Sequence, residues 1–190
     1  ELNRYPYGCV EQVSSKARGL LALTEVRGLS EETAKKIQLG IDNLLAKQKM
    51  SGAFGYWSAN SRTYEVYQPY ALDTLQKLLP YADNPDQVVT AINNGLEYMY
   101  RSNFADQSTQ LYAYGILARS GYEVTSRARY TIDRILSRQR SELLSANARP
   151  YLMANALDDF ALAYWTAANL SDTKRMMQVA EKVRYLLDQS

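Results

Sequence analysis

Apolar residues recur along most of the chain at the three- and four-residue spacing that places them on one face of a helix. In the first such segment, at about residues 9–26, they are Val13, Ala17, Leu20, Leu21 and Leu23. The same spacing predicts further helices at about residues 31–49, 67–78, 85–101, 107–119, 125–141, 150–168 and 171–188. We therefore predict an all-α protein, with at most a short ribbon of sheet in residues 50–64.

A weak internal repeat organises these helices. Residues 40–45, 95–100 and 131–136 share a pattern, and each is followed by a helix rich in tyrosine and alanine. Repeats of this kind are typical of stacked helical hairpins, and small residues on the second helix let neighbours approach closely. We interpret residues 1–190 as a single domain with the architecture of an α/α toroid, in which inner and outer helices alternate and the ring is allowed to be incomplete.

Charge and hydropathy argue against two kinds of partner, nucleic acid and the membrane interior. The chain has 22 Lys and Arg against 20 Asp and Glu, a net charge of only +2, and no segment concentrates basic residues. Nucleic-acid binding therefore has no electrostatic basis here. No apolar run approaches the roughly 20 residues that cross a bilayer, so we expect this domain not to be membrane-embedded.

Two absences are informative, one for the chemistry of the chain and one for its origin. The chain has no histidine, which excludes Ser-His-Asp and Cys-His hydrolases and His-ligated zinc, and we expect neither metal nor cofactor. It also begins at Glu1 without a methionine or signal segment. We therefore expect a module taken from a much longer protein.

Residues 5–12 read Tyr-Pro-Tyr-Gly-Cys-Val-Glu-Gln and contain the only cysteine. If a helix begins near Cys9, Cys9 and Gln12 lie one turn apart on the same face. A thiol and a carboxamide held that close can condense, with loss of ammonia, into an internal thioester that stores an acyl group for an incoming nucleophile. The alternative is that Cys9 is simply a small buried hydrophobe, as most lone cysteines are.

This octapeptide resembles the thioester signature of the alpha-2-macroglobulin and complement superfamily, and its form is most similar to the bacterial branch. The resemblance implies the α/α toroid fold, with Cys9 as acyl carrier and Gln12 as acyl donor. It implies a broad-spectrum endopeptidase inhibitor, serving bacterial defence, that traps an attacking protease covalently and only once, and so is not an enzyme. Its partners would be target proteases and other domains of the same protein. The parent protein would be periplasmic and anchored to the inner membrane as a lipoprotein.

The other residues of the motif have expected roles. Tyr5 and Tyr7 are the nearest large side chains that could shield the bond from water, although ordinary aromatic packing is an equal alternative. Gly8 supplies a turn before the helix, and Glu11 is an acid in its first turn, where it favours the helix dipole. Since the chain lacks the histidine that some complement members use, the resemblance implies direct transfer to lysine amines.

The segment Phe54-Gly55-Tyr56-Trp57 resembles a loop of bacterial thioester domains and, more loosely, of terpenoid cyclases. We interpret it as a turn between helices whose aromatic side chains pack on the core.

Two other functions remain open. The first is a helical scaffold for protein contacts in which Cys9 never cyclises. The second is an α/α-barrel enzyme acting on glycans or isoprenoids, which needs paired carboxylates. The available aspartates, in no recognisable arrangement, are Asp42, Asp73, Asp133, Asp158 and Asp159.

Overall fold

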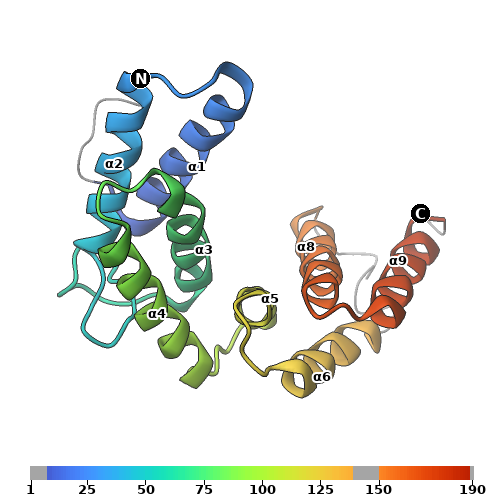
Figure 1. Cartoon of the computed structure of the whole chain (residues 1–190). Coiled ribbons are helices and arrows are strands. Elements are labelled where there is room, and N and C mark those ends of the chain that lie inside the picture. The colour runs from blue at the N-terminus through green and yellow to red at the C-terminus, as the bar shows by residue number, and fades with distance from the viewer. Residues whose placement is uncertain (1–7, 139–149, 189–190) are drawn as a thin grey trace. The chain divides into compact units, whose positions relative to one another are not determined.

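A computed structural model describes residues 8–138 and 150–188. In these residues every regular element is helical, which confirms the all-α prediction (Figure 1). The helices are α1 (Val10–Arg27), α2 (Glu31–Leu45), α3 (Gln68–Leu78), α4 (Pro85–Arg101), α5 (Gln107–Arg119), α6 (Thr125–Leu136), α8 (Pro150–Asn169) and α9 (Thr173–Asp188). Two short 3-10 helices, η1 (Glu65–Tyr67) and η2 (Leu79–Tyr81), flank α3. In place of the expected ribbon, Gln48 and Phe54 form an isolated antiparallel bridge.

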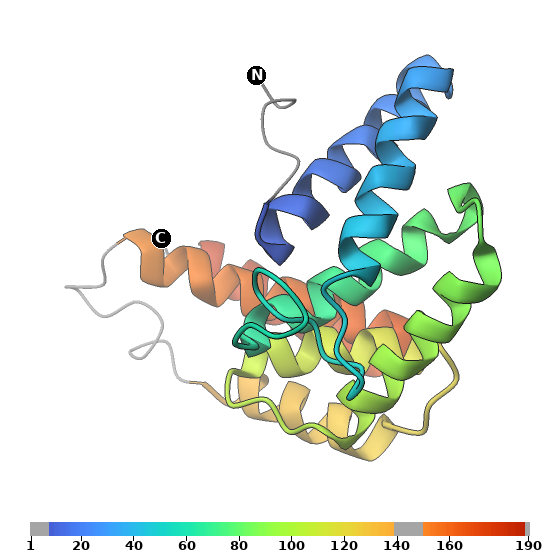
Figure 2. The ribbon, with the colours of Figure 1, turned by 90° about the vertical axis from the view of Figure 1, so that its left-hand side faces the viewer.

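The chain divides into two compact units, the first ending at Ser102 and the second beginning at Asn103. The single domain over residues 1–190 stays a prediction. In the first unit, α1 packs against α2 and α3, and α3 packs against α4 (Figure 2). The buried apolar side chains that join these helices include Ala17, Ile37, Ile41, Leu44, Leu72, Leu75 and Leu96.

A buried carboxylate fixes α1 on α3. Asp73 is 1% exposed, and it accepts a hydrogen bond from Arg18 at 2.7 Å and another from Lys77. The Arg18 guanidinium also lies 4.0 Å from the centre of the Tyr70 ring. Because an unpaired charge is costly to bury, these contacts specify how the N-terminal helix sits on its neighbour.

The second unit has a core of its own. Helix α8 packs against α5, α6 and α9, with Phe160 and Ala163 of α8 buried among Leu111, Ile132 and Val179. At Gly115 of α5 an added Cβ would lie 2.1 Å from the Trp165 ring of α8, so only glycine allows this approach. The expectation that small residues bring neighbouring helices together is thus met at this contact.

Two helices end earlier than expected. Helix α2 stops at Leu45 rather than residue 49, because the next residues turn inward toward the loop described below. Helix α6 stops at Leu136, and Ser137 is its C-cap. None of the described helices combines the length and the apolar character that a membrane crossing needs.

Candidate functional site

Cys9 and Gln12 meet at the start of α1. Cys9 is the N-cap, with extended backbone dihedrals of −65° and 168°, and Gln12 occupies the N3 position. The Cys9 backbone N–H donates a hydrogen bond to Oε1 of Gln12 at 3.1 Å. The Cys9 side chain is 2% exposed, whereas Gln12 is exposed. The two residues therefore lie one helical turn apart, with the carboxamide oxygen held at the N-terminus of the helix.

The residues around this pair fit it closely. At Gly8 an added Cβ would lie 3.0 Å from Cβ and 3.3 Å from Oε1 of Gln12, so glycine leaves the room that the glutamine needs. Glu11 is an exposed acid in the first turn, as expected, and its interaction with Tyr67 contributes to raising the pKa of that tyrosine. Tyr5 and Tyr7 lie outside the described residues, and their shielding role stays a prediction.

The loop after α2 docks on the same helix end. The Val10 N–H donates to the Tyr56 carbonyl at 2.8 Å, and the Tyr56 N–H donates to the Arg62 carbonyl at 2.9 Å. The Lys47 Nζ donates to the Trp57 carbonyl at 2.8 Å, and Lys47 is only 6% exposed. The loop is thus attached to α1 through its backbone, and the hydrogen bond from the buried Lys47 side chain holds it a second time.

Its aromatic residues divide into two roles. Phe54 is 1% exposed and packs in the core, as the sequence predicted. Tyr56 instead forms an aromatic cluster with Trp57, Tyr64 and Tyr67, in which its ring centre lies 5.1, 5.0 and 5.5 Å from theirs. Trp57 is 59% exposed, so the interpretation of this loop as core packing was wrong for Trp57.

The electrostatics of the site centre on the Cys9 sulfur. Interaction with the Cys9 side chain, followed by burial and by the charges of Cys9, Tyr67 and Glu11, raises the pKa of Tyr56 to about 12. Burial, followed by the hydrogen bond to Glu11, raises the pKa of Tyr67. Burial lowers the pKa of Lys47, while the nearby Cys9 opposes that change. The Tyr56 phenol and the Lys47 ammonium group are thus both coupled electrostatically to the Cys9 side chain.

Sequence reasoning missed Lys47, Tyr56 and Tyr67 as members of this site. The available signal was the resemblance of residues 54–57 to a loop of thioester domains. Helical periodicity carried no such signal, since Cys9 and Tyr56 belong to different local segments. The arrangement can hold a carboxamide oxygen at a backbone N–H and a sulfur at a phenol, which are the two atoms that gain charge in acyl transfer.

Three of the five aspartates considered for an α/α-barrel enzyme form ion pairs with basic side chains. Asp73 pairs with Arg18 and Lys77, as described, and Asp133 pairs with Arg175 at 2.6 Å. Asp159 lies within α8, is 8% exposed, and is bound by Arg138 and Ser108. In the part of the chain that the structure describes, no three His, Cys, Asp or Glu side chains are grouped to bind a metal ion.

Comparison with known proteins finds relatives of this helical chain in sequence and in fold. No protein-family model matches the chain. Alpha-2-macroglobulin of Escherichia coli (strain K12) is 33% identical over 111 residues, which are 53% of this chain and 6% of that protein. A structure of trypsin-activated E. coli alpha-2-macroglobulin matches with a TM-score of 0.68 and 21% identity, over 95% of this chain and 13% of the other. Salmonella alpha-2-macroglobulin reacted with methylamine matches with a TM-score of 0.67 and 22% identity, over 98% of this chain and 12% of the other.

The chain is thus a helical relative of part of a much larger protein. Its homologue in sequence and its neighbours in fold are bacterial alpha-2-macroglobulins, which confirms the resemblance predicted from the octapeptide. The α/α class of the fold is confirmed by the same structures. The chain spans only 6% of the length of its E. coli relative.

Proposed function

We propose that this chain is the thioester domain of a bacterial alpha-2-macroglobulin-like protease inhibitor. The observation that carries the proposal is the pairing of Cys9 and Gln12 at the N-terminus of α1, with the carboxamide oxygen 3.1 Å from the Cys9 backbone nitrogen. A thioester between these residues would trap an attacking protease through its lysine amines. The other domains of the full-length protein and the target protease would be its partners.

The chemistry balances with the groups present. In forming the bond, the Cys9 sulfur attacks the carboxamide carbon of Gln12, the C–N bond breaks, and the thiol proton leaves with the ammonia. In using it, an amine nitrogen attacks the same carbon, the C–S bond breaks, and the amine proton passes to the sulfur. In both steps negative charge develops on the former Oε1, which the Cys9 N–H and the helix N-terminus stabilise.

Relatives support this chemistry. One Salmonella relative is described as reacted with methylamine and one E. coli relative as activated by trypsin, an amine and a protease respectively. The absence of histidine in this chain supports direct transfer to amines, since no imidazole is present to take the acyl group first. A periplasmic, lipid-anchored parent protein remains part of the proposal.

The test is uptake of methylamine at Gln12. Intact mass of untreated protein should show the loss of one ammonia, and treatment with methylamine should leave a methylamide on the peptide that contains Gln12. Cys9→Ser should abolish both results, because an ester at this position is unlikely to form and is a weaker acyl donor. In competition with glycerol, methylamine should dominate. Folded, unhydrolysed protein that yields no adduct with either would instead support the scaffold with a non-cyclised Cys9.

A further inference from the structure

We propose that the Tyr56 hydroxyl is a catalytic residue of acyl transfer, which donates a hydrogen bond to the Cys9 sulfur as that sulfur leaves. The inference rests on the proposed function, since it concerns the same bond. It assigns a reacting role to a residue 47 positions away in sequence, outside the octapeptide.

The backbone on both sides of Tyr56 is fixed, on one side by α1 and on the other by the segment that follows α2. The Tyr56 carbonyl accepts from Val10, the residue that follows Cys9, at 2.8 Å. On the near side, Gly55 donates to the Lys47 carbonyl at 2.9 Å, and a Cβ at Gly55 would lie 1.9 Å from the Ser58 carbonyl oxygen. The loop therefore has one close-packed path, and that path places Tyr56 next to the cysteine.

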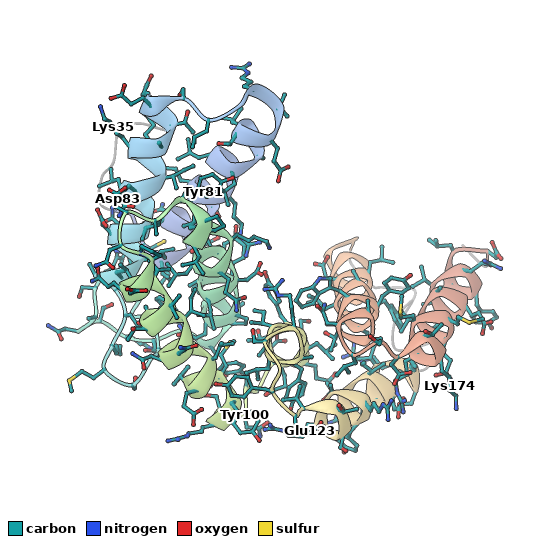
Figure 3. The ribbon with its side chains drawn as sticks, viewed as in Figure 1. Lys35, Tyr81, Asp83, Tyr100, Glu123 and Lys174 are labelled. Atoms are coloured by element: carbon teal, nitrogen blue, oxygen red, sulfur yellow. The ribbon has the colours of Figure 1, made fainter. Side chains whose placement is uncertain are left out.

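The ring of Tyr56 is fixed as well. It stacks on Tyr67 with 5.5 Å between ring centres and 27° between planes, and it meets the edges of Trp57 and Tyr64 at 77° and 72°. These three contacts hold the ring in place. Figure 3 shows the side chains of the two units as sticks on the ribbon.

The phenol acts as a donor and not as a base. Interaction with the Cys9 side chain is the largest cause of a Tyr56 pKa raised to about 12, so the phenol keeps its proton at neutral pH. When an amine attacks Gln12 and the C–S bond breaks, the electron pair stays on sulfur, and the Tyr56 O–H stabilises that thiolate without losing its own proton. The proton released by the amine then passes to the sulfur. The charged or titratable groups that act on this pair are Lys47, Tyr67 and Glu11.

Tyr56→Phe tests the proposal, because it removes the hydroxyl and keeps the ring. In protein whose thioester has been opened, the midpoint of the thiolate absorbance titration should move upward in this variant. Methylamine uptake at Gln12 should slow by about tenfold, since hydrogen bonds to charged groups are the strong ones. Tyr64→Phe is the matched control. It alters the same aromatic cluster without touching Cys9 and should change neither measurement.

A second variant guards against a structural effect of the first. Incorporation of a fluorinated tyrosine at position 56 keeps the ring and the hydroxyl but makes the phenol a stronger donor, so the thiol midpoint should move downward. Opposite shifts in the two variants confirm the role. Equal midpoints in wild-type protein and both variants overturn it. The thiol titration decides this even if wild-type protein takes up no methylamine, a result that would overturn the proposed function instead.

Discussion

Cys9 occupies a position that Ser, Thr, Asp or Asn usually fills, since those side chains accept hydrogen bonds from the first turn of a helix. Gln12 takes the N3 position of a capping box, where Glu or Gln reaches back to the N-cap N–H. The local structure at the site is thus an ordinary helix start with a thiol in place of a hydroxyl. That substitution converts a cap into a pair of groups able to react with each other.

At the residue scale, Gly55 offers a test of how tightly the loop is held. Gly55→Ala should destabilise the protein by roughly 2–4 kcal/mol, because its Cβ would lie 1.9 Å from the Ser58 carbonyl oxygen and the backbone would have to shift. Gly19→Ala is the control. Gly19 is exposed within α1 and has nothing within 4 Å, so alanine there should stabilise the protein by about 0.5–1 kcal/mol. Urea denaturation measures both, and equal effects would contradict the packing described for the loop.

Tyr56 gives a second residue-scale prediction, for alkaline pH. Its pKa is raised from 10.0 to about 12 in the native state, so the protonated phenol favours the folded protein. That contribution is fully present below pH 10 and is lost as the pH rises toward 12. The free energy of unfolding should therefore fall less steeply between pH 9 and 11 in Tyr56→Phe than in the wild type. Parallel curves from denaturant titrations would show that the hydroxyl adds no pH-dependent stability.

At the element scale, local sequence predicted some helices fully and others only in part. Pro85 at the first turn of α4 and Gly121 just beyond α5 mark those helices, and the predicted bounds 85–101 and 107–119 match the structure. Residues 46–49 contain no helix breaker, so the end of α2 was placed too late. There the chain turns because Lys47 binds the Trp57 carbonyl, a contact that no local pattern encodes.

The same reasoning explains which part of the site was predictable. Cys9 and Gln12 are one turn apart, and a helix start is enough to bring them together. Tyr56 reaches Cys9 only through the packing of a loop on α1, so its role depended on the structure. Tertiary contacts of this kind override or extend what periodicity indicates.

The contact between α6 and α9 yields a prediction for acidic pH. Asp172 caps α9 by accepting from the Arg175 N–H at 3.2 Å, and it also binds the Arg129 side chain of α6 at 2.7 Å. Burial alone would raise its pKa, but the hydrogen bonds from Arg175 and Arg129 lower it below 3.8. The resulting stability is present above that value and is lost as the pH falls through the lower native pKa.

Asp172→Asn should therefore cost roughly 1–3 kcal/mol at pH 7 and less at pH 3, where the wild type begins to lose the same interaction. Chemical denaturation at the two pH values measures this difference. Asp158→Asn on the exposed side of α8 is the control and should be nearly neutral at both. A cost for Asp172→Asn that does not change with pH would contradict the ionic account of this contact.

At the scale of the whole molecule, the composition predicts that stability depends little on pH near neutrality. The chain contains no histidine, the side chain that ordinarily titrates between pH 5 and 8. The free energy of unfolding should accordingly be nearly constant from pH 5.5 to 7.5, when followed by the helical circular-dichroism signal in urea. A pronounced slope in this window would reveal a strongly shifted carboxyl or amino group.

The capping arrangement at Gln12 has a consequence for the fate of the site. After attack by an amine, the side chain at position 12 is a substituted amide, whose oxygen still accepts from the Cys9 N–H. After attack by water it is a glutamate, and a negative charge at the third position of a helix is favoured by the dipole. Hydrolysis therefore ends in a glutamate that the N-terminus of α1 stabilises, and nothing drives the reaction back. The helix keeps its shape in every outcome. The side chain at position 12 then shows permanently which nucleophile opened the thioester.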